Sequence, residues 1–222
     1  MRKTLSVLAV IVLGLATLPA FGATILDFGT GTAGAGGTIT QTGGNFTGTA
    51  IPLNALLFCN GAICTNYDLS GSATSSNMDA DGNAALAFNT ATGTFSITGD
   101  VHTLLPGGII GAEIVPAGTV LLSGTIGGFS ITGCSGSGTC SIQFTTGTDT
   151  KSPLLLAALG LTGTQWQFSG FTLGANLLSN GTYTATSTDI LNTAVPEPAS
   201  LLMLGSGLLT MGGVVRRKLL NR

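Results

Sequence analysis

Oxygen-bearing side chains at alternate positions are the first feature of this 222-residue sequence that could do chemistry. Asp79, Asp81 and Asn83 have the spacing at which the first ligands of a calcium loop converge on one ion. Such a loop also needs a glutamate at its twelfth position, where this sequence has Thr90. The pattern therefore favours a polar turn. Weak calcium binding is the alternative, with help from one further carboxylate, Asp68 or Asp100.

The single histidine, His102, is the next candidate. Acyl-transfer catalysis needs a base that a carboxylate orients, and Asp100 lies two residues away on the same face of an extended strand. No HExxH or G-x-S-x-G motif accompanies this pair. Glu113 is the only glutamate in the central part of the chain, which gives little support to the two-carboxylate arrangement of glycosidases. We expect no catalytic residue, and a secreted hydrolase is the least favoured alternative.

A glycine pattern near the N-terminus matches G-x-G-x-x-G at Gly29, Gly31 and Gly34. A dinucleotide site needs a helix to start at this point, so that its N–H groups meet the pyrophosphate. More glycines and the strand-like Thr-Ile-Thr follow instead. The segment predicts a glycine-rich surface loop and no cofactor.

Threonines alternate along two segments that read as strands. A period of two would place four of them on one strand face, Thr182, Thr184, Thr186 and Thr188. A shorter row follows the same period, Thr38, Thr40 and Thr42. An exposed strand face rich in β-branched residues is the plain interpretation. An ice-binding or carbohydrate-binding module that uses this face is the alternative.

Charge is scarce, since only 7% of the residues are Asp, Glu, Lys or Arg. An ordinary soluble domain carries about 25%. Between residues 24 and 195 one cation, Lys151, stands against eight acids, which gives a net charge of −7. Such a surface repels phosphate backbones, so we expect no nucleic-acid partner.

The elements that must position these residues are short strands. Apolar and small polar residues alternate around Phe95 and Ile97, around Ile142 and Phe144, and around Trp166 and Phe168, with glycine-rich breaks between them. This pattern predicts an all-β fold, an antiparallel β-sandwich of jelly-roll or Greek-key type. One short helix is expected at 152–160, with Ser152 as N-cap, Pro153 at the first position and Gly160 at the end; a short buried strand is the alternative.

The N-terminus has the layout of a secretory signal peptide over residues 1–23. Arg2 and Lys3 precede an apolar run, and Pro19 and small residues end it. Cleavage after Gly22 or after Ala23 fits the small residues there, and an uncleaved anchor is the alternative.

Four cysteines stand in two close pairs, which in an exported chain indicates disulfide bonds. Of the three possible connectivities we favour the local one, Cys59–Cys64 and Cys134–Cys140. Each such bond would add about 2 kcal/mol by a chain-entropy estimate. A four-cysteine zinc site is the alternative, but the spacings exceed the two-residue knuckle typical of zinc ligands.

The C-terminus has a second apolar segment, residues 199–215, which carries no charge and is close to the shortest helix that crosses a bilayer. Three cations follow at once, Arg216, Arg217 and Lys218, and by the positive-inside rule they would stop transfer and stay in the cytoplasm. Pro196, Glu197 and Pro198 precede the segment. Two prolines disfavour helix there and keep the backbone extended and accessible.

This order of a Pro-Glu-Pro motif, an apolar span and a basic tail resembles the PEP-CTERM sorting signal of Gram-negative bacteria. The resemblance covers about residues 195–222 and implies that exosortase, a membrane-embedded cysteine transpeptidase, cuts near the motif and delivers the protein to the surface or matrix. Together with the N-terminal layout it predicts a signal peptide (1–23), an extracytoplasmic domain (24–192) and a sorting signal (193–222, with the basic tail 216–222). The expected function is a structural or adhesive role at the cell surface, in the outer membrane or in an exopolysaccharide matrix, with polysaccharide as a partner.

Overall fold

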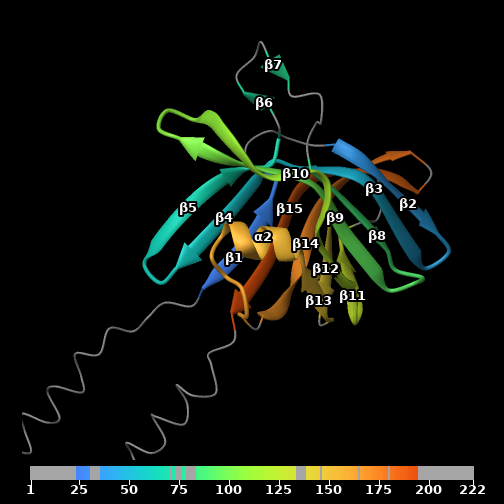
Figure 1. Cartoon of the computed structure of the whole chain (residues 1–222). Coiled ribbons are helices and arrows are strands. Elements are labelled where there is room, and N and C mark those ends of the chain that lie inside the picture. Colours follow the sequence, from blue (N-terminus) through green and yellow to red (C-terminus); the bar gives the residue numbers. More distant parts are fainter. Residues whose placement is uncertain are drawn as a thin grey trace, which may run out of the picture.

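The computed structural model describes residues 24–30, 36–70, 72–73, 77–78, 84–133, 139–145, 147–164, 166–179 and 181–194. These residues form an all-β body with one short helix (Figure 1). The elements are β1 (Ile25–Gly29), β2 (Gly36–Thr42), β3 (Asn45–Leu53), β4 (Ala55–Asn60), β5 (Ile63–Asp68), β6 (Ser72–Ala73), β7 (Asn77–Met78), β8 (Ala84–Asn89), β9 (Thr94–Leu105), β10 (Ile109–Thr125), β11 (Gly128–Thr132), β12 (Thr139–Thr145), β13 (Asp149–Lys151), α2 (Pro153–Ala158), β14 (Trp166–Ser179) and β15 (Thr182–Ala194).

The strands pair antiparallel and form one continuous main sheet, while β6 and β7 form a separate hairpin. In the main sheet the order runs β1-β4-β5-β9-β8-β3-β2-β15, and β15 also pairs with β1, so the ladders close on themselves. From β15 the sheet continues through β14, β12 and β11, and from β9 through β10 to β13. The predicted all-β, antiparallel class is confirmed.

The pairing differs from the finer expectation of a sandwich of two separately bonded sheets. β15 pairs with β2 over its first half and with β1 over its second half, so one long strand belongs to both layers. Register shifts along β9–β10 and β14–β15 bend these strands, as bulges do where a strand passes from one layer to another.

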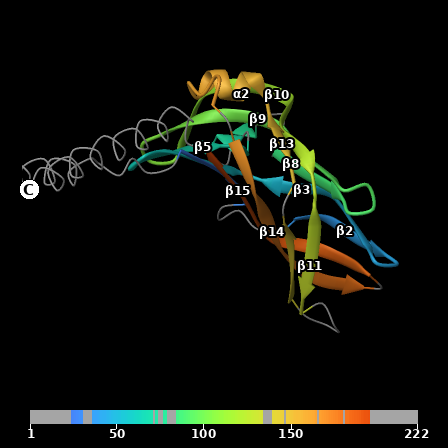
Figure 2. The same ribbon diagram turned by 90° about the horizontal axis from the view of Figure 1, so that it is seen from below.

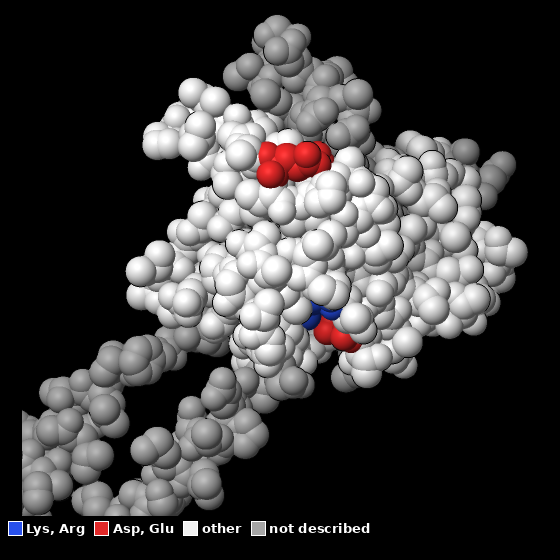
Figure 3. All heavy atoms as spheres, viewed as in Figure 1, with Lys and Arg blue, Asp and Glu red and all other residues white. Residues whose placement is uncertain are grey.

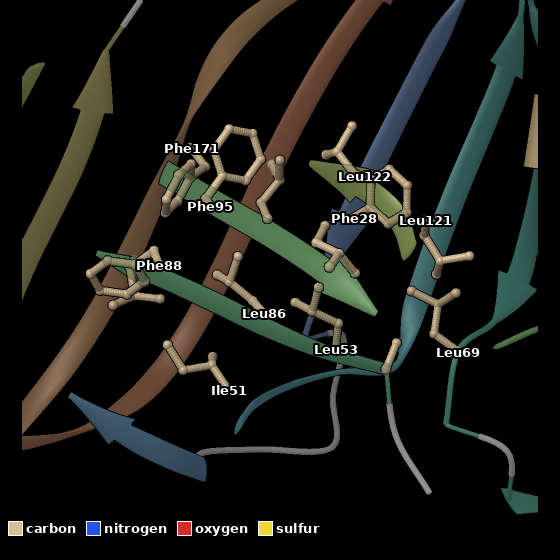
Figure 4. Packing of buried hydrophobic residues seen from close by; sticks show 14 of the residues in the cluster. Phe28, Ile51, Leu53, Leu69, Leu86, Phe88, Phe95, Leu121, Leu122 and Phe171 are labelled. Atoms are coloured by element: carbon tan, nitrogen blue, oxygen red, sulfur yellow. The ribbon is translucent and has the colours of Figure 1, made fainter. Parts of the chain in front are cut away.

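The core lies between the inner faces of these layers (Figure 4). Alternation puts Phe95, Ile97, Ile142 and Phe144 in it, each at most 3% exposed. Phenylalanine rings meet there from strands that are not paired, with Phe95 of β9 stacked on Phe168 of β14 at 5.0 Å between ring centroids. In β9 and β12 period-two alternation therefore predicted the buried face correctly.

The helix forms where the sequence predicts it, and the alternative of a short strand is wrong. α2 follows Ser152 and begins with Pro153, although the Ser152 side chain makes no capping hydrogen bond. At the C-terminal end Gly160 has φ +70° and donates to the Ala157 carbonyl, while Leu161 N–H donates to the Leu156 carbonyl. This pair of bonds is the Schellman motif, which requires a left-handed residue best supplied by glycine. The helix packs against β10 (Figure 2).

Candidate functional site

The threonine row of β15 does not lie on one face, which corrects the prediction from the sequence. A register shift lies between the pairs Gly174–Ser187 and Ala175–Ala185, so the side-chain alternation changes phase at Thr186. Thr182 and Thr184 lie on the outer side, whereas Thr188 is 5% exposed and points inward. One extra residue in a strand reverses the faces of everything after it. The single flat row needed for ice binding is therefore absent from β15.

A different polar row crosses the outer face of the sheet, transverse to the strands. Strand register places Thr182 beside Thr40 and Thr40 beside Thr47, and the row continues through Asn89 to Thr94. The inward neighbours along these strands are core residues such as Ile39, Phe46, Phe88 and Phe95. Hydroxyl and amide groups from β15, β2, β3, β8 and β9 thus line up on one surface.

A hollow of about 350 Å³ lies on this face between β3, β8 and β9. Its polar side chains are Thr47, Thr49, Asn89, Thr94 and Ser96. The side-chain oxygen Oδ1 of Asn89 accepts hydrogen bonds from the backbone N–H groups of Ala91, at 2.8 Å, and Thr92, at 3.3 Å, in the following turn. Within the described part of the chain no protein partner is found for the hydroxyls of Thr47, Thr49 and Ser96, which leaves them for water or a ligand.

The structure brings His102 and Asp100 together. His102 Nε2 lies 2.9 Å from Asp100 Oδ2, and His102 Nδ1 lies 3.4 Å from the Gly111 carbonyl oxygen. Burial by itself would lower the pKa of His102, but the hydrogen bonds to Asp100 and to Gly111 and the nearby negative charges outweigh it, so the pKa is raised. Both ring nitrogens face acceptors and Asp100 is only 1% exposed. This geometry suits a buried ion pair better than a base aimed at a substrate.

A second buried polar cluster surrounds Lys151 at the end of β13. Lys151 Nζ donates to Asp149 Oδ2 at 2.7 Å and to Asn192 Oδ1 at 3.1 Å. Its nitrogen also lies 4.8 Å from the centre of the Trp166 ring. Burial lowers the pKa of the Lys151 amine, although Asp149 opposes this shift. Figure 3 shows a single small blue area with red beside it, and a second red area near the top of the same face.

Two carboxylates on β1 and β15 form a third cluster. Burial, together with the negative charge of Asp189 and a hydrogen bond shared with it, raises the pKa of Asp27 to about 6 from its ordinary value of 3.8. Asp27 therefore keeps its proton up to a higher pH than an ordinary aspartate does. The sequence offers no sign of this pair, because 162 positions separate its members.

The disulfide Cys59–Cys64 forms as predicted, across a directly opposed pair of β4 and β5. Cys140 is disulfide-bonded too, and Cys134, its expected partner, lies outside the described residues. The calcium candidates Asp79, Asp81 and Asn83 also lie outside them, as do residues 31–35 of the glycine loop. Among the residues that the structure does describe, no three His, Cys, Asp or Glu side chains are grouped to hold a metal ion.

The sorting-signal residues 196–198, the apolar span 199–215 and the cations 216–218 follow the last described residue, as the signal peptide 1–23 precedes the first. Within the described ranges no helix is long and apolar enough to cross a bilayer. Comparison with known families identifies the C-terminal segment instead: a family model described as the PEP-CTERM protein-sorting motif matches residues 194–218. The chain carries a PEP-CTERM sorting signal. No curated protein and no solved structure matches the chain.

PEP-CTERM proteins are exported and sorted to the cell envelope or surface of Gram-negative bacteria, and they are in general exosortase substrates rather than catalysts. The match covers 25 residues, so it indicates where the protein is sorted. The function of the body has to be inferred from the geometry of the body itself. Of that geometry, sequence reasoning missed the Lys151 cluster. The available signal was a single lysine two residues after Asp149 in a body without any other cation.

Proposed function

We propose that this PEP-CTERM protein is a structural or adhesive component of the cell surface or of an exopolysaccharide matrix. The signal peptide 1–23 exports it, the span 199–215 tethers it for a time, and exosortase cuts near Pro196-Glu197-Pro198 to release or transfer the body. The sorting motif at residues 194–218 is the observation that supports this route.

The body would contact neutral polysaccharide through the transverse polar row and its hollow. Hydroxyls of Thr47, Thr49 and Ser96 can both donate and accept, as sugar hydroxyls do. No charged side chain lines the hollow, so recognition there would depend on hydrogen bonds and surface fit. Many copies of a weak contact along a polymer give strong overall attachment by avidity. Weak contacts of this kind, repeated along a polymer, would suffice to hold a protein in a matrix.

The test is binding of the full chain to an array of neutral and acidic glycans, followed by titration of the best ligand. Thr47→Val and Ser96→Ala remove hydroxyls from the hollow, and Thr172→Val, an exposed position on β14, is the matched control. We expect the hollow variants to weaken binding at least threefold, about 0.7 kcal/mol, and the control to bind like the wild type. Binding to no neutral glycan, or equal binding by all three variants, would refute this contact.

A further inference from the structure

Lys151 is the only Lys or Arg among the described residues, and its surroundings are unusual for a lysine. Its side chain is 1% exposed, that of Asp149 is 3% exposed, and Asn192 is fully buried. In strand register Asn192 lies between Leu26 of β1 and Phe168 of β14, both of them core residues. A lysine normally reaches water with its charged end, yet this one ends inside the core against a carboxamide.

We propose that Lys151 and Asn192 form an intramolecular isopeptide bond, with Asp149 as the residue that carries the protons. Three observations in one place support it: an amine next to a carboxamide, a carboxylate on the same amine, and exclusion of water from all three. The Asn192 amide nitrogen is also a buried atom without a protein partner among the described residues. That nitrogen is the leaving group the reaction requires.

The first step is proton transfer within the ion pair. The Lys151 ammonium gives one proton to Asp149, which yields a neutral amine beside a neutral carboxylic acid. A buried site favours this neutral pair, in line with the lowered pKa of Lys151. Desolvation of a lysine in an apolar pocket is a recognised way to make its amine nucleophilic.

The second step forms the new amide. Nζ of Lys151 attacks Cγ of Asn192, whose oxygen Oδ1 lies 3.1 Å from Nζ. The protonated carboxyl group of Asp149 stabilises the oxyanion that develops on Oδ1. One proton then moves from Nζ through Asp149 to the Asn192 amide nitrogen. The Cγ–Nδ2 bond breaks and ammonia leaves. Nζ keeps one hydrogen, Asp149 returns to its protonated form, and no oxidant or cofactor is needed.

The position of the bond suits a surface protein. Asn192 lies in the last strand of the body, two residues before the match to the sorting motif begins at residue 194. Lys151 lies in β13, which is bonded to β10. The cross-link would therefore join the strand nearest the attachment point to a different part of the sheet. A pull on the C-terminus would load a covalent bond instead of a ladder of hydrogen bonds.

Lys151 also provides a simple assay, because it is the only Lys or Arg between Lys3 and Arg216. Trypsin acting on the denatured, reduced full chain cuts the body at Lys151 only if the amine is unmodified. We expect the wild-type body to remain in one piece and its intact mass to be lower than the sequence requires by one ammonia. Cleavage into two fragments at full mass would overturn the proposal.

Four variants test the chemistry. Asp149→Asn and Asn192→Ala should each give two tryptic fragments and restore the full mass, and Lys151→Arg should do the same because trypsin cuts after arginine. Asn66→Ala removes an exposed asparagine of β5 and should stay uncut and one ammonia light, as the wild type. An ammonia loss that persists in Lys151→Arg would come from another site, such as a cyclised Asn-Gly, and would refute the bond.

Discussion

At the scale of single residues, the body keeps most of its few charges in specific pairs. Asp100 is bonded to His102, Asp149 to Lys151, and Asp27 faces Asp189. Lys151 and Asp149 are opposite charges that compensate each other out of water, and His102 and Asp100 are so when the imidazole is protonated, whereas Asp27 and Asp189 are a pair of like charges. Asp27–Asp189 is thus the place where pH should change the stability of the fold.

We predict that Asp27→Asn stabilises the protein at pH 8 by about 1 to 2 kcal/mol, a value reduced for solvent screening at the exposed Asp189. Because the folded-state pKa of about 6 exceeds the ordinary 3.8, the native state binds more protons than the unfolded chain between these values. The contribution of Asp27 to wild-type stability should therefore be complete below about pH 4 and be lost as the pH rises through 6.

Urea denaturation of both proteins at pH 4 and pH 8 measures this. At pH 4 Asp27 is protonated in the folded wild type, so the two proteins should differ little. Asp189→Asn should show a smaller gain at pH 8, since it removes the repulsion but leaves the Asp27 carboxylate buried, which is the larger cause of its raised pKa. A variant less stable than the wild type at pH 8 would contradict the account.

At the scale of elements, turns and bulges decide where side chains point. The bulge in β15 turns Thr188 inward, and a register shift in β3 next to Ala50, at φ +51°, accompanies the bend of that strand. Local backbone geometry is therefore as important here as composition, and adjacent glycines can have very different roles.

The turn between β2 and β3 offers a matched test of this point. Gly43 has φ +61° and Gly44 does not have a positive φ, while an added Cβ would meet no atom within 4 Å at either position. Gly43→Ala should cost about 1 kcal/mol of unfolding free energy through backbone strain alone. Gly44→Ala should be close to neutral. Equal effects of the two substitutions in urea denaturation would contradict this explanation.

At the scale of the whole molecule, the last strand of the body leads directly into the sorting signal. β15 ends at Ala194, the residue at which the PEP-CTERM match begins. β15 pairs with β1, β2 and β14, so the strand that leads into the sorting signal is bonded to three others. An isopeptide bond at Asn192 would close a loop of about 40 residues and add about 4 kcal/mol by the chain-entropy estimate used for cross-links.

Sorting itself is tested by replacing Pro196, Glu197 and Pro198 with alanines. Without the extended, proline-bounded handle we expect the protein to stay in the membrane fraction at its unprocessed size. Immunoblots of membrane and secreted fractions measure this, with Ser200→Ala, just beyond the motif, as the control that should be processed normally. Surface release of the triple variant at the wild-type level would argue against exosortase sorting.

The sequence alone determined the features that depend on local patterns. Alternation marked the buried face of the strands, Pro153 and Gly160 bounded the helix, and five-residue spacing paired Cys59 with Cys64. The sorting motif could be recognised for the same reason, since it is a short linear segment. Each of these signals lies within a few residues of the structure it specifies.

Only the tertiary structure decided the long-range features. The bulge in β15 reversed the face of Thr188, and strand order brought Asn192 to a lysine 41 residues away and Asp189 to Asp27. Side chains along a strand alternate between its two faces, so one inserted residue moves every later side chain from one face to the other. Pairings between distant strands depend on the closure of the whole sheet, which no short window of sequence contains.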